Sequence, residues 1–306
     1  MPLIELIAGA RPNFMKIAPI VEALNAAEAA GGSLRFRLIH TGQHYDRAMS
    51  ETFFEQLGIP EPDINLGVGS GSQAEQAANI MTGYERVLRE KRSDACVVVG
   101  DVTSTMACAI VAQKDGVPVA HVEGGIRSGD WTMPEEINRM VTDSITNWFF
   151  TTSEHANENL RRSGVGEERI FFVGNTMIAN LLRQMPNLRP APFWEEMGLA
   201  ADRYFVLTLH RPAKVDESTT LKAMLAAIEE GTRGCPVIFP VHPRTKKTLQ
   251  ASGLPDSFCC VDPMSYLEFN HLVKHSFAVI TDSGGITEEA TVMGVPCLTL
   301  RDSTER

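Results

Sequence analysis

The sequence contains no Cys-x-x-Cys pair, no Gly-x-Gly-x-x-Gly after a predicted strand, and no apolar run longer than a strand. We therefore expect neither a zinc site nor a nicotinamide cofactor, and no span across a bilayer. The first apolar run leads into Arg11 and not into a cleavage site, so no signal peptide is predicted. We expect a cytoplasmic protein with reduced and buried thiols. The six cysteines are Cys96, Cys108, Cys235, Cys259, Cys260 and Cys297.

Basic residues are outnumbered as well. The chain has 28 Lys and Arg against 38 Asp and Glu, a formal net charge of −10. This balance argues against nucleic acid or a membrane surface as a partner. An anionic ligand would be repelled by the molecule as a whole, so binding one requires basic residues concentrated at one place. The 306 residues, 43% of them hydrophobic, suit two globular domains.

Short apolar runs alternate with amphipathic segments along the whole chain. Strands are predicted over residues 3–8, 36–40, 95–99, 117–122, 148–151 and 170–173, and later over 204–209, 237–240, 258–261, 278–281 and 297–300. Helices are predicted between them, including 12–30, 72–91, 103–113 and 135–147. Pro19 predicts a kink or a restart in the first helix, and Ser72 with Glu75 predicts a capping box. This order indicates an α/β protein with parallel sheets covered by helices on both faces.

Three prolines between residues 185 and 199 mark a divide in this pattern. We predict one doubly wound domain over residues 1–185 and a second over residues 186–306. Ligands of open parallel sheets bind beyond the carboxyl ends of the strands. Every distinctive polar cluster in the sequence follows a predicted strand, so all of them are expected to face one cleft between the two sheets.

The most informative cluster is Asp-Ser-Gly-Gly at residues 282–285, directly after a predicted strand. Gly284 and Gly285 allow a close approach of the backbone, and the first amides of the following helix suit a phosphate. Ser283 adds a hydroxyl. Glu289, about one and a half turns into the helix, could accept hydrogen bonds from ribose hydroxyls. The alternative is a tight strand-to-helix turn without a ligand.

A second anion-binding loop follows the first strand, where Gly9 is succeeded by Arg11, Pro12 and Lys16. The alternative is two surface cations at a helix start. Further cations lie near predicted strand ends, at Arg211, Arg244, Arg301 and Arg306. Together with the Ser283 turn they supply the local positive charge that a diphosphate requires.

Carboxylates follow two successive strands, at Asp101 and at Glu123. Glycines beside both indicate closely approached backbone. Glu135 and Glu136 open the next helix, and Arg139 lies four residues after Glu135, so these two could form an ordinary surface ion pair. Carboxylates that converge on one cleft are suited to removing and returning a proton.

Histidines follow two strands of the second half, at His210 and His242, each with an arginine close by. This arrangement fits a polyanion, although His242 could simply fix its own loop. His44, beside Gln43, is equally ambiguous. Four histidines have no polar cluster of this kind around them and are expected to be structural, namely His40, His155, His271 and His275.

Six motifs occur in order from Gly9 to Arg306: Gly-x-Arg-Pro-x-x-x-Lys, Gly-Asp-x-x-Ser-Thr, His-Val-Glu-x-Gly-x-Arg, Pro-Glu-Glu-x-Asn-Arg, Asp-Ser-Gly-Gly-x-x-Glu-Glu and Arg-Asp-x-Thr-Glu-Arg. Together they resemble the non-hydrolysing UDP-N-acetylglucosamine 2-epimerases. The resemblance implies two Rossmann-like domains in a GT-B-like arrangement, a homodimer, and no metal or redox cofactor. It also implies reversible conversion of UDP-N-acetylglucosamine to UDP-N-acetylmannosamine, by elimination of UDP and its re-addition to a 2-acetamidoglucal.

The resemblance also assigns roles to individual residues. The implied acid/base group is Asp101, Glu123, Glu135 and His210. The implied UDP contacts are Arg11, Lys16, Ser283, Gly284, Gly285, Glu289 and Arg306. The implied contacts of a second, regulatory substrate molecule are Gln43, His44, Glu136, Arg211 and His242.

Two features depart from the family pattern. Residues 212–216 read Pro-Ala-Lys-Val-Asp where the family commonly has a Glu-Asn pair, which puts the regulatory contact in doubt. The chain also stops at Arg306, inside a motif after which relatives continue, so we expect an incomplete chain. The alternative functions are a 2-epimerase of a related UDP-acetamido sugar or uronic acid, a hydrolysing epimerase, a glycosyltransferase, and a non-catalytic UDP-sugar-binding protein.

Overall fold

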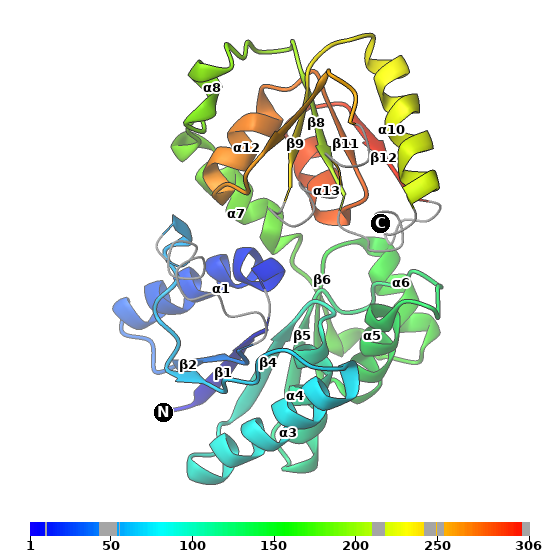
Figure 1. Ribbon diagram of the computed structural model, residues 1–306. Coiled ribbons are helices and arrows are strands. Elements are labelled where there is room, and N and C mark those ends of the chain that lie inside the picture. Colours follow the sequence, from blue (N-terminus) through cyan, green and yellow to red (C-terminus); the bar gives the residue numbers. More distant parts are fainter. Residues whose placement is uncertain are drawn as a thin grey trace. The chain divides into compact units, whose positions relative to one another are not determined.

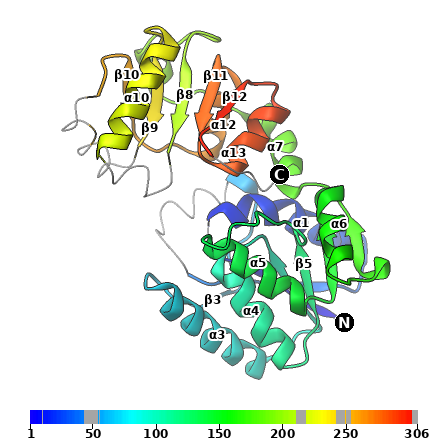
Figure 2. The ribbon, with the colours of Figure 1, turned by 90° about the vertical axis from the view of Figure 1, so that its right-hand side faces the viewer.

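The computed structural model describes residues 1–9, 11–42, 54, 56–209, 218–241, 249 and 254–301, without the side chains of residues 11, 12 and 218–220. The chain forms two compact units, and the boundary between them falls between Asn180 and Leu181. Figures 1 and 2 show a parallel sheet with helices in each unit. The predicted α/β class is thereby confirmed. This boundary lies inside helix α7 (Thr176–Gln184), whereas the prolines suggested a divide just after it.

The first unit contains a seven-stranded sheet in the order β3-β2-β1-β4-β5-β6-β7. Every neighbouring pair is parallel. The order reverses between β1 and β4, the place where open sheets of this kind bind ligands. The strands are β1 (Leu3–Ala8), β2 (Arg35–His40), β3 (Ile64–Asn65), β4 (Ala95–Val99), β5 (Val119–Val122), β6 (Trp148–Thr151) and β7 (Ile170–Phe172).

Helices cover both faces of this sheet. They are α1 (Arg11–Ala29), α3 (Gln73–Glu90), α4 (Thr103–Lys114), α5 (Pro134–Ile145) and α6 (Glu154–Arg162). Helices α3, α4 and α5 lie side by side (Figure 2), and α1 packs against β1, β2 and β4. All four residues of β5 are buried, as expected for a central strand of a covered parallel sheet.

Two local predictions for these helices can be checked. The capping box of α3 is confirmed, since Glu75 N donates to Ser72 Oγ at 3.2 Å and Ser72 N donates to Glu75 Oε2 at 2.9 Å. Of the kink or restart predicted at Pro19, the restart is wrong, because α1 continues through that residue to Ala29. A proline interrupts one hydrogen bond of a helix without ending it when the flanking residues are packed, and Ile17, Ala18 and Val21 are buried.

The second unit contains a five-stranded parallel sheet in the order β10-β9-β8-β11-β12. Its strands are β8 (Phe205–Thr208), β9 (Val237–Pro240), β10 (Phe258–Val261), β11 (Ala278–Thr281) and β12 (Cys297–Thr299). Its helices are α8 (Phe193–Glu196), α10 (Ser218–Thr232), α12 (Tyr266–Lys274) and α13 (Gly284–Val292). All five predicted strands of this half are confirmed, with small differences at their ends.

The thiols behave as predicted only in part. All six are free, and Cys96 and Cys108 are buried. Cys235 is exposed, so its expected burial is wrong; it lies in the loop before β9, where the chain returns to the sheet from α10. Within the described part of the chain, none of the helices is both long and apolar enough to cross a membrane.

Candidate active site

The turns that follow β4 and β5 bring the first two predicted carboxylates to neighbouring positions. These strands pair in register, with Val99 opposite Val122. Gly100 then adopts a positive φ of 69°. A Cβ atom at Gly100 would lie 3.1 Å from Lys16 Nζ and 3.6 Å from Glu123 Oε2, so the close approach suits glycine.

Glu123 is held in an unusual conformation. Its φ is also 69°, in the left-handed region that a side chain with Cβ rarely adopts, and only 3% of the residue is exposed. Its Oε2 accepts a hydrogen bond from Lys16 Nζ of α1 at 2.5 Å. Strained residues of this kind are concentrated at functional sites. Lys16, expected to contact UDP, is therefore paired with an expected acid/base group.

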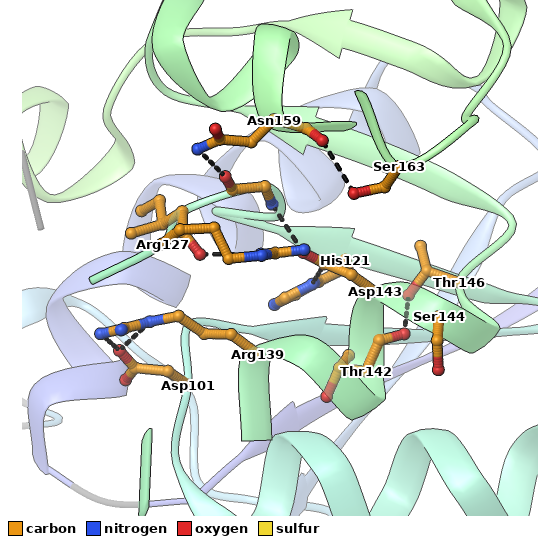
Figure 3. Close-up of polar contacts among 12 residues, drawn as sticks. Asp101, His121, Arg127, Arg139, Thr142, Asp143, Ser144, Thr146, Asn159 and Ser163 are labelled. Atoms are coloured by element: carbon orange, nitrogen blue, oxygen red, sulfur yellow. Dashed lines mark hydrogen bonds and ion pairs between the residues drawn. The ribbon is translucent and has the colours of Figure 1, made fainter. Parts of the chain in front are cut away.

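Asp101 is oriented by two residues of α5. Arg139 donates to Asp101 Oδ2 from Nη2 at 2.6 Å and from Nε at 3.1 Å (Figure 3), while Asn138 Nδ2 donates to the Asp101 carbonyl at 2.8 Å. Arg139 also donates to Glu136 Oε2 at 2.8 Å. The surface ion pair suggested for Glu135 and Arg139 is wrong, because Arg139 is buried on the face of α5 that packs toward Asp101.

Glu136 and its neighbour Glu135 have different environments. Glu136 is buried, and its carboxylate accepts hydrogen bonds from the backbone N–H groups of Ser128 at 2.9 Å and Gly129 at 3.1 Å. Burial raises the pKa of Glu136, but these bonds and the one from Arg139 outweigh it and lower the pKa overall. Glu135 is half-buried and makes no polar contact within the described part of the chain. Glu136 thus fixes a loop, and Glu135 keeps its carboxylate available.

In the second unit, the predicted phosphate turn is formed by residues that follow β11. Ser283 caps α13 in an extended conformation, with φ −94° and ψ 124°, and its hydroxyl makes no capping hydrogen bond to the described residues. Gly284 and Gly285 form the first turn of the helix. Arg301 Nε donates to the Asp282 carbonyl at 2.5 Å, which places a cation beside the positive end of this helix.

Glu289 is buried in the same helix, with 4% exposure. Tyr266 Oη of α12 donates to Glu289 Oε1 at 2.7 Å. The pKa of Glu289 is raised to about 7, mainly by burial. The negative charge of Glu288 raises it as well, whereas the hydrogen bond from Tyr266 lowers it. A carboxyl group that ionises near neutrality can accept hydrogen bonds from neutral hydroxyls once they arrive.

The comparisons with known proteins bear on this geometry. The profile of the UDP-N-acetylglucosamine 2-epimerase family matches residues 26–306. The UDP-N-acetylglucosamine 2-epimerase of Methanocaldococcus jannaschii is 41% identical over 99% of this chain and 84% of its own length. The chain belongs to this family. It is accordingly an isomerase, and the resemblance found in the six motifs is confirmed.

A solved structure of the same M. jannaschii enzyme and one further epimerase are also similar to this chain. The crystal structure of the M. jannaschii enzyme in complex with UDP-GlcNAc and UDP has a TM-score of 0.87 at 40% identity, covering 100% of this chain and 85% of that one. The UDP-2,3-diacetamido-2,3-dideoxy-D-glucuronate 2-epimerase of Pseudomonas aeruginosa is 38% identical over 98% of this chain and 83% of its own length.

Several predicted site residues of this epimerase lie outside the described part of the chain. These are the side chain of Arg11 and the residues Gln43, His44, His210, Arg211, His242, Arg244 and Arg306.

His40 is buried and its Nδ1 accepts a hydrogen bond from Gly42 N at 2.9 Å; burial lowers the pKa of this histidine to about 4. Among the described residues, no group of three or more His, Cys, Asp or Glu side chains could hold a metal ion.

Sequence reasoning assigned no role to three residues that the structure places next to the candidate site, namely His121, Arg127 and Asp143. His121 lies in β5 and is hydrogen-bonded to Asp143 of α5 (Figure 3). Arg127 Nη1 donates to Asp143 Oδ2 at 2.6 Å. The available signal was a histidine inside an otherwise apolar strand, since a fully buried histidine requires hydrogen-bonding partners.

Proposed function

We propose that the protein interconverts UDP-N-acetylglucosamine and UDP-N-acetylmannosamine. The observation that carries the proposal is the juxtaposition of Asp101 and Glu123 at the ends of neighbouring strands, each held by a cation. Inversion at C2 of a pyranose requires a proton to leave one face and another to arrive at the opposite face, and positioned carboxylates can serve both steps. The similarity to a structure that contains UDP-GlcNAc and UDP supports the same substrate here.

The proposed reaction begins with departure of UDP, which takes the electron pair of the C1–O bond. The C2 proton becomes acidic as C1 gains cationic character, and a carboxylate removes it to leave neutral 2-acetamidoglucal. A proton is then added to the other face of C2 while UDP attacks C1 again. Atoms and charge balance without an oxidant, a metal or a redox cofactor. Cations beside the diphosphate stabilise the charge that develops on the leaving group.

We assign the proposed roles as follows. The acid/base group consists of Asp101, Glu123, Glu135 and His210. UDP is bound by Arg11, Lys16, Ser283, Gly284, Gly285, Glu289 and Arg306, with Glu289 on the ribose. A regulatory substrate molecule contacts Gln43, His44, Arg211 and His242, and the protein acts as a homodimer. Glu136 was expected at the regulatory site too, but its buried carboxylate already accepts from Ser128, Gly129 and Arg139, so we propose no substrate contact for it. The environment of Ser283 supports the UDP assignment, because the first amides of its helix have no intrahelical partners and lie next to Arg301.

A second candidate substrate is a UDP-diacetamido uronic acid. The 38% identity to the P. aeruginosa enzyme favours it, and that identity is close to the 41% shared with the M. jannaschii enzyme. The two candidates differ in charge at C6 of the sugar. The ratio of kcat/KM for the two substrates separates them directly.

Incubation with UDP-N-acetylglucosamine in heavy water tests the proposal. We expect a manno-configured product that carries deuterium at C2, because the departing proton exchanges with solvent before another is returned. Proton NMR of the recovered nucleotide sugars measures both features. Recovery of only unlabelled starting material would contradict the proposed function, and release of free sugar would indicate hydrolysis instead.

A further inference from the structure

His121 lies next to the chain segments that carry the two proposed catalytic carboxylates. It is the third residue of β5, two positions before Glu123, and it is 0% exposed. Its Nδ1 lies 2.7 Å from Asp143 Oδ1, and its Nε2 lies 2.8 Å from the carbonyl oxygen of Gly100, the residue before Asp101. The ring therefore joins the ends of β4 and β5 to helix α5.

Both atoms that face the ring are acceptors. A backbone carbonyl oxygen cannot donate, and a neutral imidazole carries one N–H and one lone pair. A neutral His121 would therefore turn a lone pair either toward the Gly100 carbonyl or toward the Asp143 carboxylate, in a place that water does not reach. Only the imidazolium, with an N–H on each nitrogen, donates to both.

Asp143 is fixed as a carboxylate by other donors. Its Oδ2 accepts from Arg127 Nη1 at 2.6 Å and from Gly125 N at 3.0 Å (Figure 3). Burial raises the pKa of Asp143, but His121 and Arg127 outweigh it and lower the pKa overall. A protonated Asp143 that donates to a neutral ring is thereby disfavoured.

The remaining surroundings favour the charged ring as well. Burial lowers the pKa of His121, but the bond and charge of Asp143, the Gly100 carbonyl and the charge of Glu123 outweigh it and raise the pKa overall. Lys16, whose positive charge would oppose a charged ring, is paired with the Glu123 carboxylate. Gly124 leaves room for the pair, since a Cβ there would lie 3.3 Å from both His121 Nδ1 and Asp143 Oδ1.

We infer that His121 is a buried imidazolium that acts as a positioning residue: its Nε2–H fixes the Gly100 carbonyl and, through it, the turn that presents Asp101. Arg139 holds the Asp101 carboxylate, and His121 holds the carbonyl of the preceding residue. The catalytic part of this inference rests on the proposed epimerisation, whereas the state of the ring does not.

Nitrogen-15 NMR of protein labelled in histidine tests the state of the ring. We expect His121, assigned by loss of its signals in His121→Asn, to show an N–H at both ring nitrogens at pH 7. The second N–H should disappear only at alkaline pH, and kcat should fall with the same midpoint. Folding raises the pKa of His121, so its charged ring stabilises the folded protein fully below about pH 6.5, the ordinary pKa of histidine. This stabilisation is lost as the pH rises through the pKa of His121 in the folded protein. A single N–H at pH 7 would overturn the inference.

Two variants separate the hydrogen bond to Gly100 from the charge. His121→Ala removes both, and we expect kcat to fall about 100-fold with KM and UDP affinity little changed, since small misplacements have effects of that size. In Asp143→Asn, the N–H groups of Arg127 and Gly125 both need an acceptor, so the amide oxygen of Asn takes the place of Oδ2. The amide NH₂ group then points at His121 Nδ1 and donates to it. The ring then becomes neutral and still donates from Nε2 to Gly100, and kcat should stay within about tenfold of the wild type.

Unchanged kcat in His121→Ala, or a loss in Asp143→Asn as large as in His121→Ala, would overturn the positioning role. Should His121→Ala fail to fold, a loss of kcat larger than about tenfold in Asp143→Asn would still overturn the positioning role, and the wild-type spectrum would still test the state of the ring. His155→Asn, on the exposed side of α6, is the matched control and should change neither kcat nor the His121 signals. If the wild-type protein does not epimerise the substrate, the proposed function fails, and the spectrum still reports the ring.

Discussion

Replacement of Glu123 by glutamine is expected to lower kcat about 1000-fold, within the roughly 10²–10⁴-fold range of a positioned acid or base. The amide cannot accept the C2 proton. It keeps the shape of the carboxylate, and its oxygen can still accept from Lys16, which lies 2.5 Å from Glu123 Oε2. UDP affinity should therefore stay within about threefold of the wild type. Turnover of UDP-N-acetylglucosamine and calorimetric titration with UDP measure the two effects.

The matched control for this variant is Glu90→Gln, an exposed position near the end of α3 that should leave kcat unchanged. Asp101→Asn should resemble Glu123→Gln, because Arg139 can still donate to the amide oxygen. UDP affinity that falls in step with kcat would contradict the acid/base role and would indicate that these carboxylates organise the UDP contacts instead.

Arg139→Met is expected to destabilise the first unit by about 3 kcal/mol. Removing one partner of a buried ion pair leaves the other charge uncompensated, at a cost of about 3–5 kcal/mol. We expect a cost at the lower end of this range for two reasons. The Asp101 side chain is 30% exposed and can be partly hydrated, and Glu136 still accepts hydrogen bonds from the N–H groups of Ser128 and Gly129. Native-state hydrogen exchange of the β4 and β5 amides measures the change within this unit alone.

Arg89→Met provides the comparison for that experiment. Arg89 donates to Glu85 at 2.8 Å in an ion pair of the same kind, but 70% of its side chain is exposed. Exposed pairs contribute about 0–1 kcal/mol, so this variant should change the exchange free energy by less than about 0.5 kcal/mol. A loss below about 1 kcal/mol in Arg139→Met would show that Arg139 does not compensate the two carboxylates.

The sequence predicted the sheets well because their strands are defined by local patterns. A buried parallel strand such as β9 or β11 is a short apolar run between polar residues, and that run is visible without knowledge of its neighbours. The same pattern predicted that Asp101, Glu123 and Ser283 follow strands. Their positions after strand ends come from chain order alone, and the structure agrees with all three.

Side-chain partners could not be predicted in the same way. Arg139 can reach Glu135, Glu136 or Asp101, and the choice depends on how far α5 is rotated against β4, which the helical pattern does not determine. The charge of His121 depends on two acceptors from distant segments, the Gly100 carbonyl and Asp143. Such contacts are products of tertiary packing, and the sequence of one segment does not contain them.

Departure of UDP from the sugar is the central claim, and an oxygen-18 label tests it most directly. The substrate is UDP-N-acetylglucosamine labelled in the oxygen that joins C1 to the β-phosphorus. If that bond breaks and re-forms, rotation of the bound β-phosphate will move the label into non-bridging positions, and phosphorus-31 NMR of the recovered nucleotide sugar will show the shift. Epimerised product in which all of the label remains in the bridge would contradict the account.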